Sequence, residues 1–441
     1  MLIRKNIKEK VLSLILSLVL TVGLVPSTVF AAPVEDLWVN GVNILTAENN
    51  TVACGSGVAV YDPNTATLTL NNAVIETADN GIGISKQGDY DVANKLNVEL
   101  VGVNTITSNE TNQMHMGIYS MGTVSIKGEG SLLIETAINS SSYLSAGIYA
   151  WGGCNITDSR ITLKNISSQE SFSSAIDVNK FDASLRIKNA IISIDNYVVG
   201  INVPSGDLTV QGSSITVANA DCGISGGNEI DNFVIQGSRL DFTGEGVSYV
   251  GLLNGRDIQI DSSFVKIISQ NSNAIYTNGG AITIRNGCSL EMNAHYPALF
   301  SNLDTTITDS TVIAISTADS GIYSQANIII NGRADILARG KWAGINANGN
   351  ITINDGKIYA TSSDDMGIYL RGTFTMNGGD VYAQGATGFA AIGARYTQQD
   401  GDTESVAKIV INSNFAEIGG GKVSVSDWYT GTSDGIPWSR S

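Results

Sequence analysis

Residues 344–366 contain three short alternating stretches, which read Gly344-Ile345-Asn346-Ala347, then Asn350-Ile351-Thr352-Ile353-Asn354-Asp355-Gly356, then Lys357-Ile358-Tyr359-Ala360. Alternation of β-branched and polar residues is typical of short β-strands, and the Gly, Asn, Asp and Ser residues between the stretches are typical of tight turns. This unit therefore predicts a coil of about 23 residues that holds three strands.

The same unit recurs along most of the chain. From Gly200 onward the repeats start every 23 or 24 residues with a single interval of 28, whereas the earlier intervals are 36, 30, 28 and 25 residues. Successive coils run in the same direction, so equivalent strands must pair in parallel, about 4.8 Å apart. The sequence predicts an all-β fold, a right-handed parallel β-helix (solenoid) of about twelve to thirteen coils. The repeats open at Gly81, Gly117, Gly147, Ala175, Gly200, Gly223, Gly251, Ala274, Ala298, Gly321, Gly344, Gly367 and Ala391.

Alternation also predicts which side chains fill the solenoid. One coil should bury Ile345, Ile351, Ile353 and Ile358, and the preceding coil should bury Ile322, Ile328, Ile330 and Ile336. The residue after the second strand recurs as Asp261, Asn331, Asn354 and Asn377. Because stacked turn amides can hydrogen-bond from coil to coil, we expect a structural asparagine ladder there.

The N-terminus has the pattern of a secretory signal peptide. Basic residues occur within the first ten positions, an apolar run extends from Val11 to Pro26, and the stretch from Ser27 to Ala31 supplies small residues at the expected cleavage positions. We expect cleavage after Ala31. The run is shorter than the roughly 20 residues of a membrane span, and no comparable run follows, so we expect no integral membrane segment after cleavage.

Four segments follow from these patterns. Residues 1–31 are assigned as the signal peptide, 32–75 as an N-terminal β cap, 76–416 as the parallel β-helix and 417–441 as a C-terminal cap or tail. The cap assignment rests on the strand patterns before the first coil, because a solenoid must protect the open edge of its first coil. The last segment contains Trp428, Tyr429 and Trp438.

Composition excludes several classes of function. The net charge of −16 disfavours nucleic acid and anionic membranes as partners, since both bind basic surfaces. The four cysteines (Cys54, Cys154, Cys222 and Cys288) are far apart and contain no C-x-x-C pair, so we interpret them as buried or incidental thiols. His115 and His295 are the only histidines and belong to no recognisable motif. We expect no metal site, no cofactor and no catalytic residues that the sequence can identify.

The opening strings Leu37–Val42 and Val60–Ala73 resemble a module of exported β-helix proteins of Firmicutes, often labelled carbohydrate-binding-domain-containing. This resemblance covers about the first tenth of the secreted part of the chain. The coils after it resemble β-helix repeats in general, including those of pectate-lyase-like proteins. The resemblance implies an extracellular, glycan-facing role, and it carries over no catalytic residue.

The third residue of each opening block should point outward, because its neighbour points inward. Tyr276, Phe300 and Tyr323 occupy this position in consecutive coils, and Tyr369 follows after a gap. Flat aromatic rings suit sugar rings, so we consider the column a candidate glycan-binding strip, the alternative being cross-strand packing alone. The polar members of the column indicate exposure to solvent. The column reads Tyr119, Tyr149, Asp177, Asn202, Ser225, Leu253, Tyr276, Phe300, Tyr323, Asn346 and Tyr369.

A second, weaker candidate is an acidic patch in the last turn of successive coils. Asp319, Trp342 and the pair Asp364-Asp365 fall there, with Trp342 in the coil between the carboxylates. Two carboxylates can act as acid and base in glycoside cleavage, but two coils would separate them by about 10 Å. The alternative is that these Asp residues only stabilise their turns.

Three functions remain open. The first is a secreted or cell-surface-associated protein that binds an extracellular glycan or another host or cell-surface polymer without catalysis, in the manner of an adhesin. The second is a polysaccharide lyase or glycosidase. The third is a structural or spacer protein of the surface.

Overall fold

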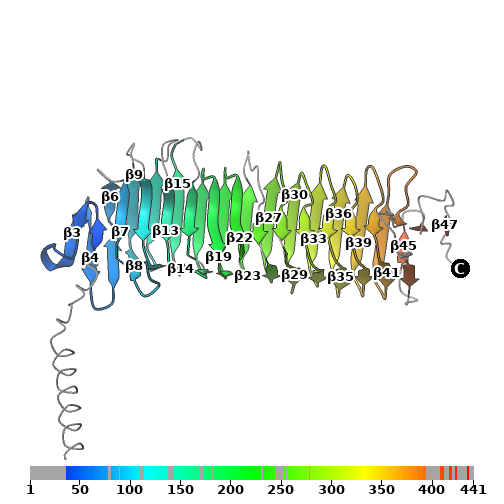
Figure 1. Cartoon of the computed structure of the whole chain (residues 1–441), viewed down its shortest axis with the longest axis horizontal. Helices are drawn as coiled ribbons and strands as arrows, with labels where there is room; N and C mark the ends of the chain where they lie inside the picture. The colour runs from blue at the N-terminus through cyan, green and yellow to red at the C-terminus, as the bar shows by residue number, and fades with distance from the viewer. Residues whose placement is uncertain are drawn as a thin grey trace, which may run out of the picture.

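The computed structural model describes residues 36–393, apart from 78–80, 89, 109–113, 138–143, 168–172, 181, 230–231, 244–251, 255 and 278, and the strand backbones at 408–411, 417–419, 423–424 and 435–436. The described chain forms an elongated rod in which the strands succeed one another along the long axis (Figure 1). Three sheets run along this rod. We call them the opening, middle and closing sheets, in the order in which each coil visits them.

The opening sheet contains the strand that starts each coil. Its members pair in parallel from coil to coil, as in Ile275↔Leu299 and Leu299↔Ile322, and β1 is antiparallel to β7 at the N-terminal end. Its strands are β1 (Leu37–Val39), β2 (Val42–Asn43), β7 (Ile82–Lys86), β10 (Met114–Ser120), β13 (Leu144–Ala150), β16 (Ser174–Val178), β19 (Val199–Ser205), β22 (Cys222–Glu229), β25 (Leu252–Asn254), β28 (Ile275–Thr277), β31 (Leu299–Ser301), β34 (Ile322–Ser324), β37 (Ile345–Ala347), β40 (Ile368–Leu370), β43 (Ile392–Gly393), β46 (Val423–Ser424) and β47 (Gly435–Ile436).

The middle sheet begins with an antiparallel segment. A short 3-10 helix, η1 (Glu48–Asn50), precedes β3, which pairs antiparallel with β4, and β4 with β5. The parallel pairing starts between β5 and β8. The strands of this sheet are β3 (Thr51–Cys54), β4 (Gly57–Asp62), β5 (Thr67–Asn71), β8 (Lys95–Val101), β11 (Thr123–Lys127), β14 (Gly153–Thr157), β17 (Leu185–Lys188), β20 (Leu208–Gln211), β23 (Asn232–Gln236), β26 (Asp257–Asp261), β29 (Ile282–Arg285), β32 (Thr305–Thr308), β35 (Ile328–Asn331), β38 (Ile351–Ile353), β41 (Thr373–Met376) and β44 (Lys408–Ile411).

The closing sheet is parallel throughout and has 14 strands. The predicted parallel β-helix is therefore confirmed, although the number of coils differs slightly from the expected twelve to thirteen. The strands are β6 (Val74–Thr77), β9 (Val103–Ser108), β12 (Ser131–Thr136), β15 (Arg160–Asn165), β18 (Ile191–Asp195), β21 (Ser214–Ala218), β24 (Arg239–Thr243), β27 (Phe264–Ser269), β30 (Ser289–Ala294), β33 (Thr311–Ser316), β36 (Asp335–Gly340), β39 (Lys357–Ser362), β42 (Asp380–Gln384) and β45 (Glu417–Gly419).

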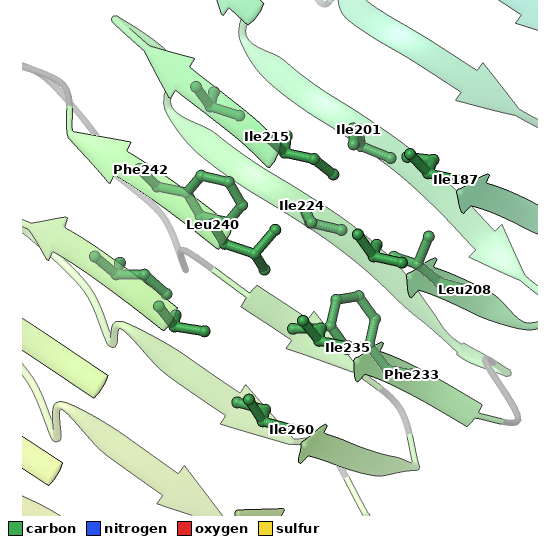
Figure 2. Packing of buried hydrophobic residues seen from close by; sticks show 14 of the residues in the cluster. Ile187, Ile201, Leu208, Ile215, Ile224, Phe233, Ile235, Leu240, Phe242 and Ile260 are labelled. Carbon is green, nitrogen blue, oxygen red and sulfur yellow. The ribbon is translucent and has the colours of Figure 1, made fainter. Parts of the chain in front are cut away.

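The interior is one continuous column of aliphatic side chains. All eight isoleucines that alternation assigned to the interior are at most 3% exposed, which confirms the inward positions. Figure 2 shows this packing in the central coils, where Ile201, Ile215 and Leu208 come from three different sheets and point toward one another. Each fully buried aliphatic side chain contributes about 1.5–3 kcal/mol, so the stacked core is the main source of stability.

The turn between the middle and closing sheets repeats a feature that we did not predict. Its first residue adopts a left-handed backbone in coil after coil, for example Asp158, Asn189 and Asp309, and Asn and Asp tolerate this conformation better than most residues. The next residue is small and buried, and its Oγ or Sγ accepts a hydrogen bond from the backbone N–H of the equivalent residue one coil earlier. This ladder runs through Ser213, Ser238, Ser263, Cys288 and Ser310.

The asparagine ladder is confirmed in the C-terminal coils. The Asn354 Nδ2 donates to Asn331 Oδ1 at 2.7 Å, and Asn377 Nδ2 donates to Asn354 Oδ1 at 2.7 Å. Asp261 does not continue it, because its carboxylate accepts hydrogen bonds from the side chains of Arg285 and Asn286 instead.

The four cysteines are free and buried, and burial raises the pKa of the Cys154 and Cys222 thiols to about 12. Cys288 is a member of the serine ladder. These thiols are therefore held in the protonated form, which is the unreactive one.

Some expectations concern residues outside the described ones. They include the signal peptide at 1–31 and the residues Trp428, Tyr429 and Trp438. Within the last expected segment, β45 and β46 still pair in parallel with β42 and β43. Among the described residues, no helix is long and apolar enough to span a membrane.

Candidate functional site

A pocket lies at the corner where the closing strand of one coil turns into the opening strand of the next. We call it the corner pocket. It has a volume of about 260 Å³ and is lined by Lys341, Trp342, Asp364 and Asp365. Lys341 and Trp342 come from the turn between β36 and β37, and the two aspartates come from the equivalent turn one coil later, between β39 and β40. Three of the four residues of the predicted acidic patch thus meet in one pocket.

The indole of the corner pocket is open to solvent. Trp342 is 57% exposed, although tryptophan is a residue that folding normally covers to a large extent. The turn itself is rigidly held, since the backbone N–H groups of Lys341 and Trp342 both donate to the carbonyl of Asp319. The pocket therefore presents a large flat apolar surface on a fixed backbone.

Charged groups surround this indole. The Lys341 Nζ lies 3.8 Å from Asp364 Oδ2, and the side chains of both residues are about half exposed. The Asp364 Oδ1 accepts a hydrogen bond from Ser363 Oγ at 2.8 Å. Asp365 is only 7% exposed, and its Oδ1 accepts the backbone N–H of Met366 at 2.9 Å. An exposed ion pair of this kind adds little stability, and its groups remain available to a polar ligand.

Asp319 does not line the corner pocket. Its Oδ1 accepts a hydrogen bond from the backbone N–H of the next residue, Ser320, at 2.6 Å. Its own backbone N–H donates to Ser316 Oγ at 2.9 Å. This carboxylate therefore stabilises its own turn, as Asp commonly does.

The predicted aromatic column lies in register on the outer face of the opening sheet. Tyr276, Phe300 and Tyr323 are direct partners on successive strands, and Tyr369 follows after Asn346. All four aromatic side chains are half-buried. The position of the column along the solenoid therefore agrees with the sequence pattern.

The rings of this column do not form one flat surface. Tyr276 and Phe300 are stacked, with centroids 4.9 Å apart and planes at 11°, but Phe300 and Tyr323 meet edge to face at 87°. The Tyr323 hydroxyl accepts a hydrogen bond from Asn348 Nδ2 at 3.0 Å, which holds this ring in its rotated position. Cross-strand packing is thus part of the role of these rings, and only the first pair offers stacked faces.

The N-terminal members of the same column lie on the same face but are covered. Tyr149 is 7% exposed and Asp177 is 3% exposed, so the expected exposure to solvent is wrong for both residues. Tyr119 is half-buried and stacks on Tyr149 with ring centroids 5.3 Å apart. Tyr149 belongs to a small apolar cluster outside the main core, together with Met116, and Tyr119 packs against this cluster.

Several residues near the corner pocket were missed by the sequence analysis. Lys341 directly precedes Trp342, and its charge next to an aromatic residue in a turn was an available signal. Tyr359 and Tyr382 lie on the closing sheet, stacked with centroids 4.5 Å apart and planes at 3°. Their spacing of one coil could have been recognised in the same way as the opening column. Tyr296, 49% exposed, occupies the same corner two coils before Trp342.

Neither histidine lies in the corner pocket. His115 is fully buried, and its Nδ1 lies 3.2 Å from Ser108 Oγ, whereas His295 is half-buried and packs edge to face on Tyr296. Within the described part of the chain, no three His, Cys, Asp or Glu side chains come together in an arrangement that could hold a metal ion.

Comparison with protein-family models, with curated proteins and with solved structures finds no match for this chain.

Proposed function

We propose that this protein is an exported, non-catalytic glycan-binding protein and that the corner pocket is its principal contact with the glycan. The observation that carries the proposal is the exposed Trp342 indole, held on a rigid turn between an ammonium and two carboxylates. An aromatic face stacks on the apolar face of a sugar ring, and the charged groups beside it accept and donate hydrogen bonds to sugar hydroxyls.

The solenoid supports an extended ligand. Equivalent positions recur about every 4.8 Å along the axis, close to the length of one sugar unit in an extended polysaccharide. Tyr359 and Tyr382 form a stacked pair on the strands β39 and β42, and β39 leads directly into the turn that contains Asp364. A glycan that extends from the corner pocket onto the closing sheet would meet this second aromatic surface.

Charge favours a neutral glycan over an acidic one. The chain carries a net charge of −16, and the corner pocket contains two carboxylates and one ammonium. A uronate or sialate polymer would be repelled by the negative net charge of the chain and by the two carboxylates of the pocket. The hydroxyl groups of a neutral sugar, in contrast, can donate hydrogen bonds to these carboxylates.

The carboxylates of the corner support binding better than catalysis. Asp364 and Asp365 are neighbours in one turn, and Asp319 is bonded within another. Acid and base groups of a glycosidase must face each other across the scissile bond. The signal peptide that the sequence predicts at residues 1–31 and the resemblance of the opening module to carbohydrate-binding-domain-containing proteins support a glycan-facing role outside the cell.

The test is a glycan array probed with the purified chain and with Trp342→Ala. We expect selective binding of neutral polysaccharides, weakened about tenfold in the variant, the equivalent of one lost stacking contact. Leu303→Ala is the matched control, because Leu303 is 51% exposed but lies at another corner, between β31 and β32, and its loss should leave binding unchanged.

Two results would count against the proposal. The absence of detectable binding of the wild-type chain to any glycan on the array would favour a structural or spacer role. Release of new reducing ends or unsaturated products from a bound polysaccharide, abolished by Asp364→Asn or Asp365→Asn, would establish the alternative of a glycosidase or lyase.

A further inference from the structure

Asp177 is a buried carboxylate on the outer face of the opening sheet, in β16. It is 3% exposed, and its Oδ1 accepts one hydrogen bond, from Asn202 Nδ2 at 3.2 Å. None of the ion pairs found among the described residues includes it. Burying a carboxylate with a single neutral donor is costly, because the lost hydration is not replaced by a positive charge.

A group of four aromatic rings begins next to this carboxylate with Tyr149, and we call it the N-terminal aromatic cluster. Tyr149 is the strand neighbour of Asp177 and stacks on Tyr119. Trp151, two residues beyond Tyr149, meets Tyr90 edge to face with ring centroids 5.0 Å apart. Trp151 lies in the turn that directly follows β13, and its ring packs against the apolar cluster that contains Tyr149.

An ammonium group already occupies part of this cluster. The Lys180 Nζ lies 4.7 Å from the centroid of the Trp151 ring. Aromatic faces attract cations most strongly when the cation loses its hydration, and tryptophan is the strongest of the aromatic side chains in this respect. The protein thus shows with its own side chain that the Trp151 face holds an ammonium ion.

We propose that the N-terminal aromatic cluster and Asp177 form a binding site for an organic ammonium group. The bound cation would supply the positive charge that the Asp177 carboxylate now lacks, and it would lie against the rings of Tyr149 and Trp151. Lys180 is the competing internal occupant. This site is formed by β13, β16 and their neighbours, whereas the corner pocket is formed between β36 and β40, so the inference does not depend on the proposed glycan function.

An anionic or uncharged ligand fits this site less well. An anion would be repelled by Asp177, and a neutral ligand would leave the buried carboxylate without a counter-charge. Organic ammonium groups occur in quaternary amines and in amino sugars, and both share the chemistry that the site recognises. The experiment must therefore include one probe of each kind.

The direct test is a titration of the full chain at pH 7.5 with tetramethylammonium chloride, followed by calorimetry, with sodium chloride as the ionic-strength control. We expect saturable binding. Asp177→Asn keeps the hydrogen bond to Asn202 and should weaken binding about tenfold or more, and Trp151→Leu should weaken it about tenfold. Asp319→Asn is the matched control and should have no effect.

Lys180→Met tests whether Lys180 occupies the place of the cation on the Trp151 face. If Lys180 competes with tetramethylammonium for this face, its removal should strengthen binding several-fold. Weaker binding in Lys180→Met would mean that Lys180 supports the site instead of occupying it, and this result would overturn the inference. The absence of saturable binding in both this variant and the wild type, or unchanged binding in Asp177→Asn, would also overturn it.

Two further probes identify the source of the ammonium group. Choline represents quaternary amines, and glucosamine represents amino sugars, with N-acetylglucosamine as its uncharged counterpart. Binding of choline alone assigns the site to quaternary amines. Binding of glucosamine but not of N-acetylglucosamine assigns it to amino sugars, and equal binding of the two sugars contradicts the requirement for a positive charge.

Discussion

Aromatic residues occur in two regions of the outer face of the opening sheet. The two regions share the same position in the repeat but differ in exposure to solvent and in the surroundings of the rings. Near the N-terminus, Tyr149 and Asp177 are covered and lie beside other rings. In the C-terminal coils, Tyr276 and Phe300 are stacked on adjacent strands and remain half-exposed. The same strand position thus builds an enclosed cluster in one region and an open surface in the other.

The connections between strands account for this difference. Residues 87–94 connect β7 to β8 and bring Tyr90 against Trp151, whereas only residues 325–327 connect β34 to β35. A connection of only three residues is too short to place side chains over the outer face of the sheet. The repeat therefore decides which way a side chain points, and the length of the nearby connection decides whether solvent reaches it.

The largest expected effect concerns Tyr149. We expect Tyr149→Ala to lower the free energy of unfolding by about 3–4 kcal/mol, because a nearly buried ring is replaced by a cavity. Phe300→Ala should cost only about 1–2 kcal/mol, since this ring is half-exposed. Chemical denaturation of both variants measures the difference. Equal costs would show that the two aromatic regions are energetically alike.

The next effect is a pH dependence that arises from Asp177 in the N-terminal region. Burial raises the pKa of the Asp177 carboxyl to about 6, from an ordinary value of 3.8, against the opposing hydrogen bond from Asn202. The folded state therefore binds the proton more tightly than the unfolded state, so this group destabilises the fold above pH 6 and the penalty disappears as the pH falls toward 4. The other titratable groups of this region are Tyr90, Tyr119, Tyr149 and Lys180, and none of them is a carboxyl or an imidazole group.

Asp177→Asn measures this penalty. We expect the variant to be more stable than the wild type by about 3 kcal/mol at pH 7.5, with the difference falling below about 1 kcal/mol at pH 4. Unfolding curves of both proteins at the two pH values provide the measurement, and Asp319→Asn serves as the control for loss of a charge. A constant difference at both pH values would exclude a raised pKa at Asp177.

A smaller effect is expected in the asparagine ladder of the regular C-terminal coils. Asn354→Ala removes the hydrogen bonds to Asn331 and Asn377, and we expect a loss of about 1 kcal/mol because the ladder is exposed to water. Asn354→Asp keeps the acceptor for Asn377 and loses only the donor to Asn331, so it should fall between the wild type and the Ala variant. An alanine variant as stable as the wild type would show that the ladder only follows the coils and does not hold them.

The smallest effect concerns the corner pocket. Trp342→Ala should change the free energy of unfolding by less than about 0.5 kcal/mol, because the indole is 57% exposed. Thermal unfolding of the variant checks this expectation. A large loss of stability would mean that the indole is needed for packing, and a loss of glycan binding in the same variant could then not be assigned to direct contact.

The parallel β-helix could be predicted from the sequence because the evidence for it is local and repeated many times. Ile345, Ile351 and Ile353 alternate with polar residues, and the same alternation returns at nearly constant intervals. Burial of an isoleucine on the inner face requires no knowledge of distant residues. The aromatic column of the opening sheet followed from the same register.

Other features depended on contacts between coils or between a connection and a sheet. The corner pocket combines Lys341 and Trp342 with Asp364 and Asp365 from the next coil, and their mutual orientation depends on how the two turns fold. Asp177 was expected to be exposed, as its charge and its outward position indicate, yet it is buried.

The sequence by itself determined the class of fold, the direction of the strands and the side of the sheet on which each side chain lies. These properties follow from the alternation of residues along a strand and from the length of one coil. Only the tertiary structure decided which outward residues are covered, which turns form a pocket and which carboxylate lacks a counter-charge. The physical reason is that burial and charge pairing depend on atoms from other coils. The sequence pattern within one strand does not show which atoms of the other coils will be its neighbours.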